Sequence, residues 1–272
     1  MPRIKERSAP RRALVTGASS GIGLAFAHVL AERGHDLILT ARRQDRLETL
    51  AFELRTRHGI DAVVMAEDLA DPLAPERLVS SIARRALHVD VLVNNAGYGV
   101  PGSYATTTWT DQQKFLQVLV VAVAELTHRL LPGMIERRWG RIINVASLAG
   151  MLPGVAGHTL YAASKAFVIK FSESLALETM RHGLHVTASC PGFTFSEFHD
   201  VTGTRAQVSR MPKLLWLDAD VVARASYDAV MAGVPVFVPG RVNATLATLS
   251  RVLPRSIVWG LMKRNATKFR RV

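Results

Sequence analysis

The chain has 272 residues, 49% of them hydrophobic, so it is long enough to bury a large core and too apolar to be a disordered chain. Its single cysteine, Cys190, excludes an intramolecular disulfide. The sequence has no uninterrupted apolar run of about 18 residues, so a membrane-spanning helix is not expected. The net charge of +12 comes from the two ends: residues 1–12 hold five basic side chains and one acidic, residues 241–272 hold eight basic and none acidic, and the charges of residues 13–240 cancel.

Basic tails favour anionic partners such as lipid headgroups, nucleic acid or charged substrates, although they also serve as solvated, solubilising segments. The uncharged body argues against specific nucleic-acid binding as the main function. Residues 1–12 lack the apolar centre of a secretion signal. We therefore expect a cytoplasmic protein and leave peripheral membrane contact through the basic C-terminal segment open.

Strand-like and helix-like segments alternate along the chain. The long helix that starts near Thr110 is expected to begin with a capping box completed by Gln113. In chain order, we expect the strand Ala13–Thr16, the helix Gly21–Arg33, the strand Asp36–Thr40, the helix Gln44–His58, the strand Ala62–Ala66, a helix after Asp71-Pro72, the strand Val89–Val93, the helix from Thr110, the strand Arg141–Ala146, the helix Tyr161–His182, the strand Val186–Cys190, the helix Asp218–Met231 and the strand Val234–Val238.

The expected strands are nearly continuous runs of Val, Ile and Leu, which is the pattern of a parallel sheet covered on both faces. Right-handed crossovers then give a doubly wound, Rossmann-type α/β fold of about seven strands. We expect one catalytic domain at 13–240, between a basic arm at 1–12 and a basic amphipathic extension at 241–272. Ligands of such folds bind beyond the C-terminal ends of the strands.

The first strand runs into the sequence Thr-Gly-Ala-Ser-Ser-Gly-Ile-Gly and then into a helix. Glycines permit a tight turn and a close approach of the backbone to a pyrophosphate, and a helix N-terminus attracts negative charge. A glycine trio in this strand–loop–helix context predicts dinucleotide binding far more strongly than the glycines alone. The candidate residues in this loop are Gly17, Ser19, Ser20, Gly21, Ile22 and Gly23.

Further motifs follow in a fixed order: Asp68-Leu69 after the third strand, NNAG at 94–97 after the fourth, Ser147 after the fifth, YxxxK at 161–165, and Pro191-Gly192 with Thr194 after the sixth. Together with the TGxxxGxG loop, this order resembles the short-chain dehydrogenase/reductase family over residues 13–194, and the pattern continues to about 240. The resemblance implies hydride transfer between a nicotinamide cofactor and a carbonyl or alcohol carbon. It also implies cofactor contacts from Asp68, Leu69, Asn95, Ala96, Gly97, Tyr161, Lys165, Pro191, Gly192 and Thr194.

The residues that follow the second expected strand predict which nicotinamide cofactor the protein prefers. An enzyme that prefers NAD usually has an acidic residue there to hold the adenosine ribose, and the equivalent position is Ala41. Arg42 and Arg43 follow, and guanidinium groups suit a 2′-phosphate. The sequence therefore favours NADP(H), with NAD(H) as the alternative. A competing interpretation of Arg43 is a solvated residue that only starts the next helix.

The expected reacting groups are Ser147, Tyr161 and Lys165. A free tyrosine, with a pKa of about 10, is a poor base at neutral pH, whereas a nearby ammonium favours the phenolate and lowers that pKa. Residues i and i+4 of a helix share one face, so Tyr161 and Lys165 point together. Tyr161 is the expected general acid/base, and Ser147 would hydrogen-bond the substrate oxygen and orient it.

One position departs from the family pattern. The family often carries a catalytic asparagine on the long helix, and the equivalent residue is Leu119. In the family this asparagine supports a water of the proton relay, which a leucine side chain cannot hold. Either the relay is rebuilt, through Gln117 or the backbone, or turnover is impaired. We expect an active enzyme, because Ser147, Tyr161 and Lys165 are present.

The resemblance also implies a mobile substrate lid at about 195–217. Its apolar residues suggest a partly apolar small-molecule substrate, although they would equally serve packing against the body. Family members are commonly homodimers or homotetramers. The main alternative function is a catalytically weak dinucleotide-binding sensor or scaffold, supported only by Leu119.

Overall fold

A computed structural model describes residues 10–100, 102–154, 159–195 and 212–253, together with 256, 259, 260 and 263. Its centre is a parallel sheet of seven strands in the order β3-β2-β1-β4-β5-β6-β9. This order confirms the expected doubly wound, Rossmann-type fold, because the chain reverses direction across the sheet between β1 and β4. The strands are β1 (Arg12–Thr16), β2 (Asp36–Thr40), β3 (Ala62–Val64), β4 (Val91–Asn94), β5 (Gly140–Val145), β6 (Leu184–Ser189) and β9 (Val236–Phe237).

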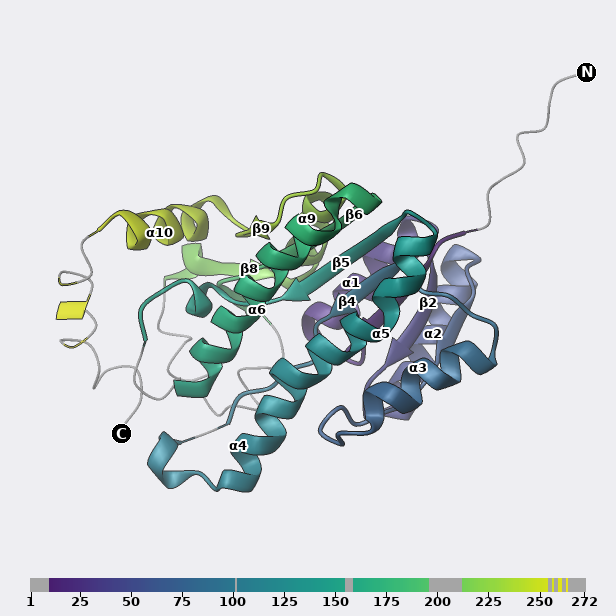
Figure 1. Cartoon of the computed structure of the whole chain (residues 1–272), viewed down its shortest axis with the longest axis horizontal. Coiled ribbons are helices and arrows are strands. Elements are labelled where there is room, and N and C mark those ends of the chain that lie inside the picture. Colours follow the sequence, from purple (N-terminus) through teal and green to yellow (C-terminus); the bar gives the residue numbers. More distant parts are fainter. Residues whose placement is uncertain are drawn as a thin grey trace, which may run out of the picture.

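Two helical layers cover the sheet (Figure 1). The helices α1 (Gly21–Glu32), α2 (Gln44–His58) and α9 (Ala219–Met231) contribute to the apolar core on one face. The helices α3 (Ala74–Arg84), α4 (Trp109–Leu116), α5 (Ala122–Glu136) and α6 (Thr159–Thr179) contribute to the core on the other.

The strands are continuously apolar because both of their faces are buried. In β1, Ala13 and Val15 belong to the first core, whereas Leu14 between them belongs to the second. In β2, Leu37 and Ile38 likewise fall in different cores. Successive side chains of a strand point to opposite faces, so a strand between two helical layers has no polar face.

The helices α4 and α5 continue one another through η2 (Gln117–Val121), a turn of π-helix, to form one helix over Trp109–Glu136. By length and composition this helix could cross a membrane, but in the fold its apolar residues, such as Leu119 and Leu126, cover the sheet. The expected cap was wrong: Thr108, not Thr110, begins the helix, and its hydroxyl accepts a hydrogen bond from the Asp111 backbone N–H at 3.1 Å. Gln113 is exposed.

Beyond the main sheet, β7 (Phe193–Phe195) and β8 (Trp216–Asp218) form a two-stranded parallel sheet that the sequence pattern did not predict. The Trp216 ring stacks on Phe193 and Phe195, with centroids 5.5 Å and 4.6 Å apart. Most of the expected lid, at 196–211, lies outside the described residues. The remaining elements are η1 (Tyr104–Thr106), η3 (Leu148–Gly150), η4 (Met180–His182), η5 (Lys213–Leu215) and α10 (Arg241–Val252).

Candidate active site

The glycine loop lies between β1 and α1, at the carboxyl edge of the sheet. Gly17 has φ +68°, a conformation that only glycine adopts without strain. At Gly23, a Cβ would overlap the carbonyl oxygen of Gly17 and lie 2.8 Å from its carbonyl carbon. The helix therefore starts directly against the loop backbone, and its free N–H groups can face an anion.

Hydrogen bonds from the NNAG motif hold the glycine loop against the end of β4. The Asn95 side-chain amide donates hydrogen bonds to the carbonyl oxygens of Thr16, at 2.9 Å, and Gly17, at 3.4 Å. The Thr16 hydroxyl accepts from the backbone N–H groups of Asn95 and Ala96, at 2.9 Å and 3.0 Å. Asn95 thus acts on the glycine loop through its side chain. Gly97 is exposed beyond it.

Arg43 reaches back over the glycine loop instead of pointing into solvent. Its guanidinium donates to the Ser19 hydroxyl at 3.0 Å and to the Ser20 hydroxyl at 2.8 Å. Arg42 is exposed, and its charge acts on Tyr98, which follows the NNAG motif. Two guanidinium groups and two hydroxyls therefore flank the C-terminal end of β2, a set of donors suited to a phosphate.

The other candidate cofactor residues lie along the same edge. Asp68 is exposed and accepts from the Ala70 N–H at 3.0 Å, whereas Leu69 is buried in the core. Pro191 and Gly192 form the turn after β6, and the Pro191 carbonyl accepts from the Leu148 N–H at 2.9 Å. Thr194 is 5% exposed, and its hydroxyl donates to the Gly192 carbonyl at 3.3 Å. Leu69 could contribute to a nucleotide site through its backbone only.

Ser147 and Tyr161 meet although they are 14 positions apart. Their side chains share a hydrogen bond, and the Ser147 hydroxyl also accepts from the Ala149 N–H at 3.2 Å. The close packing of η3 on α6 needs Gly150, since a Cβ there would lie 2.6 Å from the carbonyl carbon of Lys165. A glycine that the sequence analysis did not single out therefore brings Ser147 to the helix that carries Tyr161.

Lys165 is buried, 6% exposed, and its Nζ donates to the Val145 carbonyl at 2.7 Å. The Nζ lies 5.9 Å from the centre of the Tyr161 ring, so the two residues share a helix face as expected. Burial lowers the pKa of Lys165 to about 8. Burial also raises the pKa of Tyr161, and the hydrogen bond from Ser147 opposes this only in part. The expected lowering of the Tyr161 pKa was wrong, because desolvation of the phenolate outweighs the stabilising contacts.

Below the site lies a buried polar chain that the sequence analysis missed. The Asn94 amide donates to the Thr127 hydroxyl at 3.0 Å and to Asn144 Oδ1 at 2.8 Å, and the Asn144 amide donates to the Ser172 hydroxyl at 2.9 Å. All four residues are nearly inaccessible. The chain joins β4 and β5 to α5 and α6, which fixes α6 relative to the sheet edge. The only sequence signal for this chain was that two strands, which the structure shows to be neighbours, each carry an asparagine near the C-terminal end.

Leu119 lies in the π-helical turn η2 and is 1% exposed. Its Cδ1 lies 3.8 Å from where a Cβ would stand on Gly97, so it packs beneath the NNAG motif. Gln117, two residues earlier, has a buried Nε2 without a hydrogen-bond partner among the described residues. Turns of π-helix are often found at functional sites. The helix is therefore distorted at the position of the family's asparagine, although leucine stands there.

We expect Leu119→Asn to leave turnover within about threefold of wild type, because Ser147, Tyr161 and Lys165 do not depend on the Leu119 side chain. The buried amide should nevertheless lower the free energy of unfolding by about 1–3 kcal/mol. Steady-state rates and thermal melts measure both effects, and Leu119→Ala controls for the loss of packing. A rate increase of about tenfold in Leu119→Asn alone would show that the wild-type relay is incomplete.

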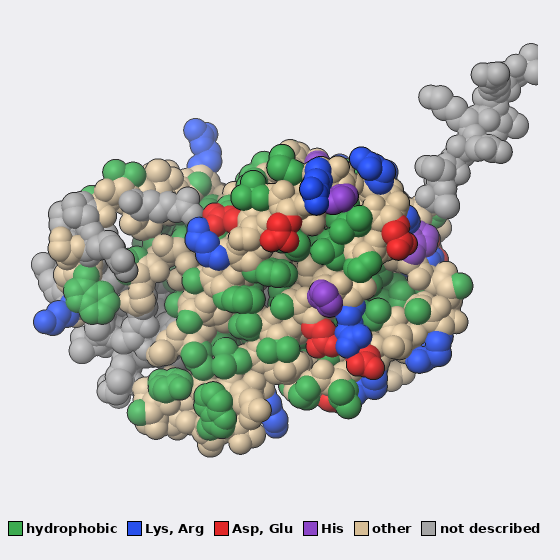
Figure 2. All heavy atoms as spheres, in the orientation of Figure 1, with side chains coloured by type: hydrophobic (Ala, Val, Ile, Leu, Met, Phe, Trp, Pro, Cys, Tyr) green, Lys and Arg blue, Asp and Glu red, His purple; other side chains and the backbone are tan. Residues whose placement is uncertain are grey.

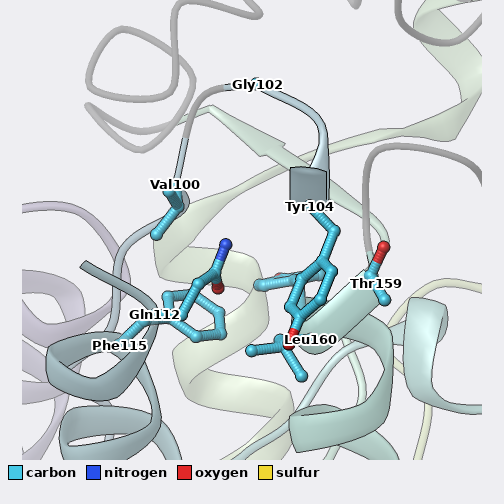
Figure 3. A pocket seen from close by; sticks show the side chains of 8 residues that line it. Val100, Gly102, Tyr104, Gln112, Phe115, Thr159 and Leu160 are labelled. Carbon is cyan, nitrogen blue, oxygen red and sulfur yellow. The ribbon is translucent and has the colours of Figure 1, made fainter. Parts of the chain in front are cut away.

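A hollow of about 300 Å³, which includes open solvent, adjoins Tyr161 (Figure 3). The Tyr104 ring lies on one side, with its hydroxyl toward Leu160, and Gln112 and Phe115 lie on the other. Gln112 is 7% exposed, and its Nε2 donates to the Thr107 hydroxyl at 2.6 Å. The full lining is Val100, Gly102, Tyr104, Gln112, Phe115, Thr159, Leu160 and Tyr161.

A glycine loop at a helix N-terminus, beside a serine, a tyrosine and a lysine at one sheet edge, defines a dinucleotide-binding oxidoreductase fold. The model of the family described as short chain dehydrogenase matches residues 11–207. The chain therefore belongs to the short-chain dehydrogenase/reductase family.

Three similar proteins match two thirds or more of this chain. The sulfoacetaldehyde reductase of Chromohalobacter salexigens is 38% identical over 186 residues, 68% of this chain and 72% of that protein. The very-long-chain 3-oxoacyl-CoA reductase of Rattus norvegicus is 30% identical over 250 residues, 90% of this chain and 76% of that protein. A short-chain dehydrogenase from Sphingobium yanoikuyae, solved in complex with NADPH, superposes with a TM-score of 0.79 at 30% identity, covering 93% of this chain and 95% of that one.

Proposed function

We propose that the protein is an NADP(H)-dependent reductase of a carbonyl group, or the corresponding alcohol dehydrogenase, with Tyr161 as the general acid/base. The observation that carries this proposal is the contact of Tyr161 with Ser147, one helical turn from the buried Lys165 and facing the hollow of Figure 3. NADPH oxidation with a panel of ketones, aldehydes and acyl thioesters tests it. Binding of NADPH without turnover of any of them would favour the dinucleotide-binding sensor instead.

The chemistry of the three side chains favours reduction at neutral pH. When bound, the nicotinamide supplies or accepts the hydride. Burial keeps the Tyr161 phenol protonated, so it can donate a proton to the oxygen of a reduced carbonyl. Ser147 accepts a backbone hydrogen bond and contacts Tyr161, so its hydroxyl can orient the same oxygen. The charge of Lys165 stabilises the phenolate that proton donation leaves.

The residues at the glycine loop fit a phosphorylated dinucleotide. The backbone at Gly17 and Gly23 leaves no room for a Cβ, as close approach of a pyrophosphate requires. Arg43, Ser19 and Ser20 form a cluster of donors at the end of β2, where an adenosine 2′-phosphate would need them. No acidic side chain stands at Ala41 to repel that phosphate.

We expect the double change Arg42→Ala/Arg43→Ala to lower kcat/KM with NADPH by about 100-fold and to change kcat/KM with NADH by less than about threefold. Each charged hydrogen bond to the 2′-phosphate contributes about 1.5–3 kcal/mol, and NADH lacks that group. Steady-state kinetics with both cofactors measure the effect.

Arg46→Ala is the control for loss of a nearby positive charge, because this exposed arginine lies in the first turn of α2. An equal loss with both cofactors would contradict the proposed role of the arginines.

The hollow beside Tyr161 is lined by the apolar side chains of Val100, Phe115 and Leu160 as well as by polar groups, which fits a partly apolar small-molecule substrate. The two reductase relatives are named for a small sulfonated aldehyde and for a long acyl thioester, so relationship alone leaves the substrate class open. We further propose a homodimer or homotetramer, by analogy with the family.

A further inference from the structure

The helix α10 is held against the body of the protein by one side only. Asn243 and Ala247 are 2% and 3% exposed. The Asn243 side chain lies directly on the backbone of Gly192, where an added Cβ would be 2.6 Å from its Nδ2. The segment η5 also packs against α10. The inner side of α10 therefore rests on the turn of the candidate site.

A second, outward stripe of α10 is apolar and uncovered. Leu246 and Leu249 are 41% and 50% exposed, and their spacing of three residues places them on one side of the helix. Leu253, 41% exposed, follows directly after the end of α10. Trp259, further along, is 62% exposed. Apolar side chains show at this end of the molecule in Figure 2, where Figure 1 places α10. Exposed apolar side chains that are grouped on one surface helix are typical of a docking surface.

The charge of this region identifies the partner. Residues 241–272 contain eight Lys and Arg residues and no acidic residue, whereas the charges of 13–240 cancel. A second copy of the chain would carry the same excess of positive charge in this segment, which disfavours self-association through it. An anionic bilayer surface matches both the charge and the apolar stripe, and a tryptophan favours the boundary between lipid and water.

We propose that α10 docks on the surface of a membrane containing anionic lipid, with Leu246, Leu249 and Leu253 in the headgroup region. The helix is 12 residues long, which is too short to cross a bilayer, so it would rest in the interface. Because Asn243 joins α10 to the Gly192 turn, docking would bring the membrane next to the candidate site.

Flotation of the full chain with vesicles tests the proposal. We expect binding to phosphatidylcholine vesicles containing about 30% phosphatidylglycerol, and weak or no binding to pure phosphatidylcholine, because the basic residues need anionic lipid. Binding should also fall as salt is raised. The double change Leu246→Glu/Leu249→Glu should reduce partitioning at least about tenfold by removing two apolar contacts and adding two negative charges.

The matched control is Phe52→Glu/Leu73→Glu, which changes two side chains, 70% and 63% exposed, that lie outside α10. It should bind vesicles with only the small loss that two negative charges cause. Failure of wild type to float, equal binding to neutral vesicles, or equal losses in the two double variants would overturn the proposal. So would a change of oligomeric mass in Leu246→Glu/Leu249→Glu, which would assign the stripe to a second copy. No substrate is used, so these outcomes are independent of the proposed activity.

Discussion

Replacing Tyr161 with phenylalanine should lower kcat/KM for carbonyl reduction about 1000-fold, the range expected for loss of a positioned general acid. The change removes only the hydroxyl that contacts Ser147 and leaves the ring and Lys165 in place. Binding of NADPH, followed by fluorescence, should therefore change little. Tyr227→Phe is the matched control, since it removes a hydroxyl that bonds His35 at 3.0 Å on the far face of the sheet. A Tyr161→Phe enzyme as fast as wild type on an accepted substrate would rule out the proposed mechanism.

The pH profile of the wild-type enzyme measures the same role. Burial raises the pKa of Tyr161, so the acid form that reduction requires is present at neutral pH and is lost as the pH rises through the raised pKa. Burial lowers the pKa of Lys165 to about 8, so its positive charge also disappears in the alkaline range. Reduction should be flat near neutrality and decline at alkaline pH. A reduction rate that increases with pH across that range would contradict the assignment of Tyr161 as the acid.

The change Gly23→Ala should weaken NADPH binding at least about 100-fold and lower the free energy of unfolding by about 1–3 kcal/mol, as overpacking does. A Cβ at Gly23 would overlap the Gly17 carbonyl oxygen, so either the loop or the first turn of α1 must shift. The N–H groups that would face a bound pyrophosphate would move with it. Isothermal titration with NADPH and thermal melts measure the two effects.

Gly154→Ala is the control, because an added Cβ at Gly154 meets nothing within 4 Å among the described residues. It should bind NADPH and melt like wild type. Tight NADPH binding by Gly23→Ala would mean that the cofactor does not use this loop.

The amino-acid sequence alone predicted the α/β fold, the order of the main elements and the family. This was possible because strands buried on both faces must be continuously apolar, and because a turn at a phosphate accepts little but glycine. The observed bounds of β2 and α2 are the expected ones, because the apolar pattern of each segment is set by its own residues. The start of the long helix was missed because Thr108 and Thr110 both have good capping side chains, and the contacts of the first turn decide between them.

Only the tertiary structure decided what depends on residues distant in sequence. Three such contacts join separate elements. They are the contact of Gly150 with Lys165, the polar chain from Asn94 to Ser172, and the packing of Asn243 on Gly192. The direction of the Tyr161 pKa belongs to the same class, since burial is a property of the folded chain and outweighs the local effect of the YxxxK spacing. The sequence by itself thus determined which groups are available for chemistry, and the packing around them determined their protonation and position, because desolvation and contact exist only after the chain has folded.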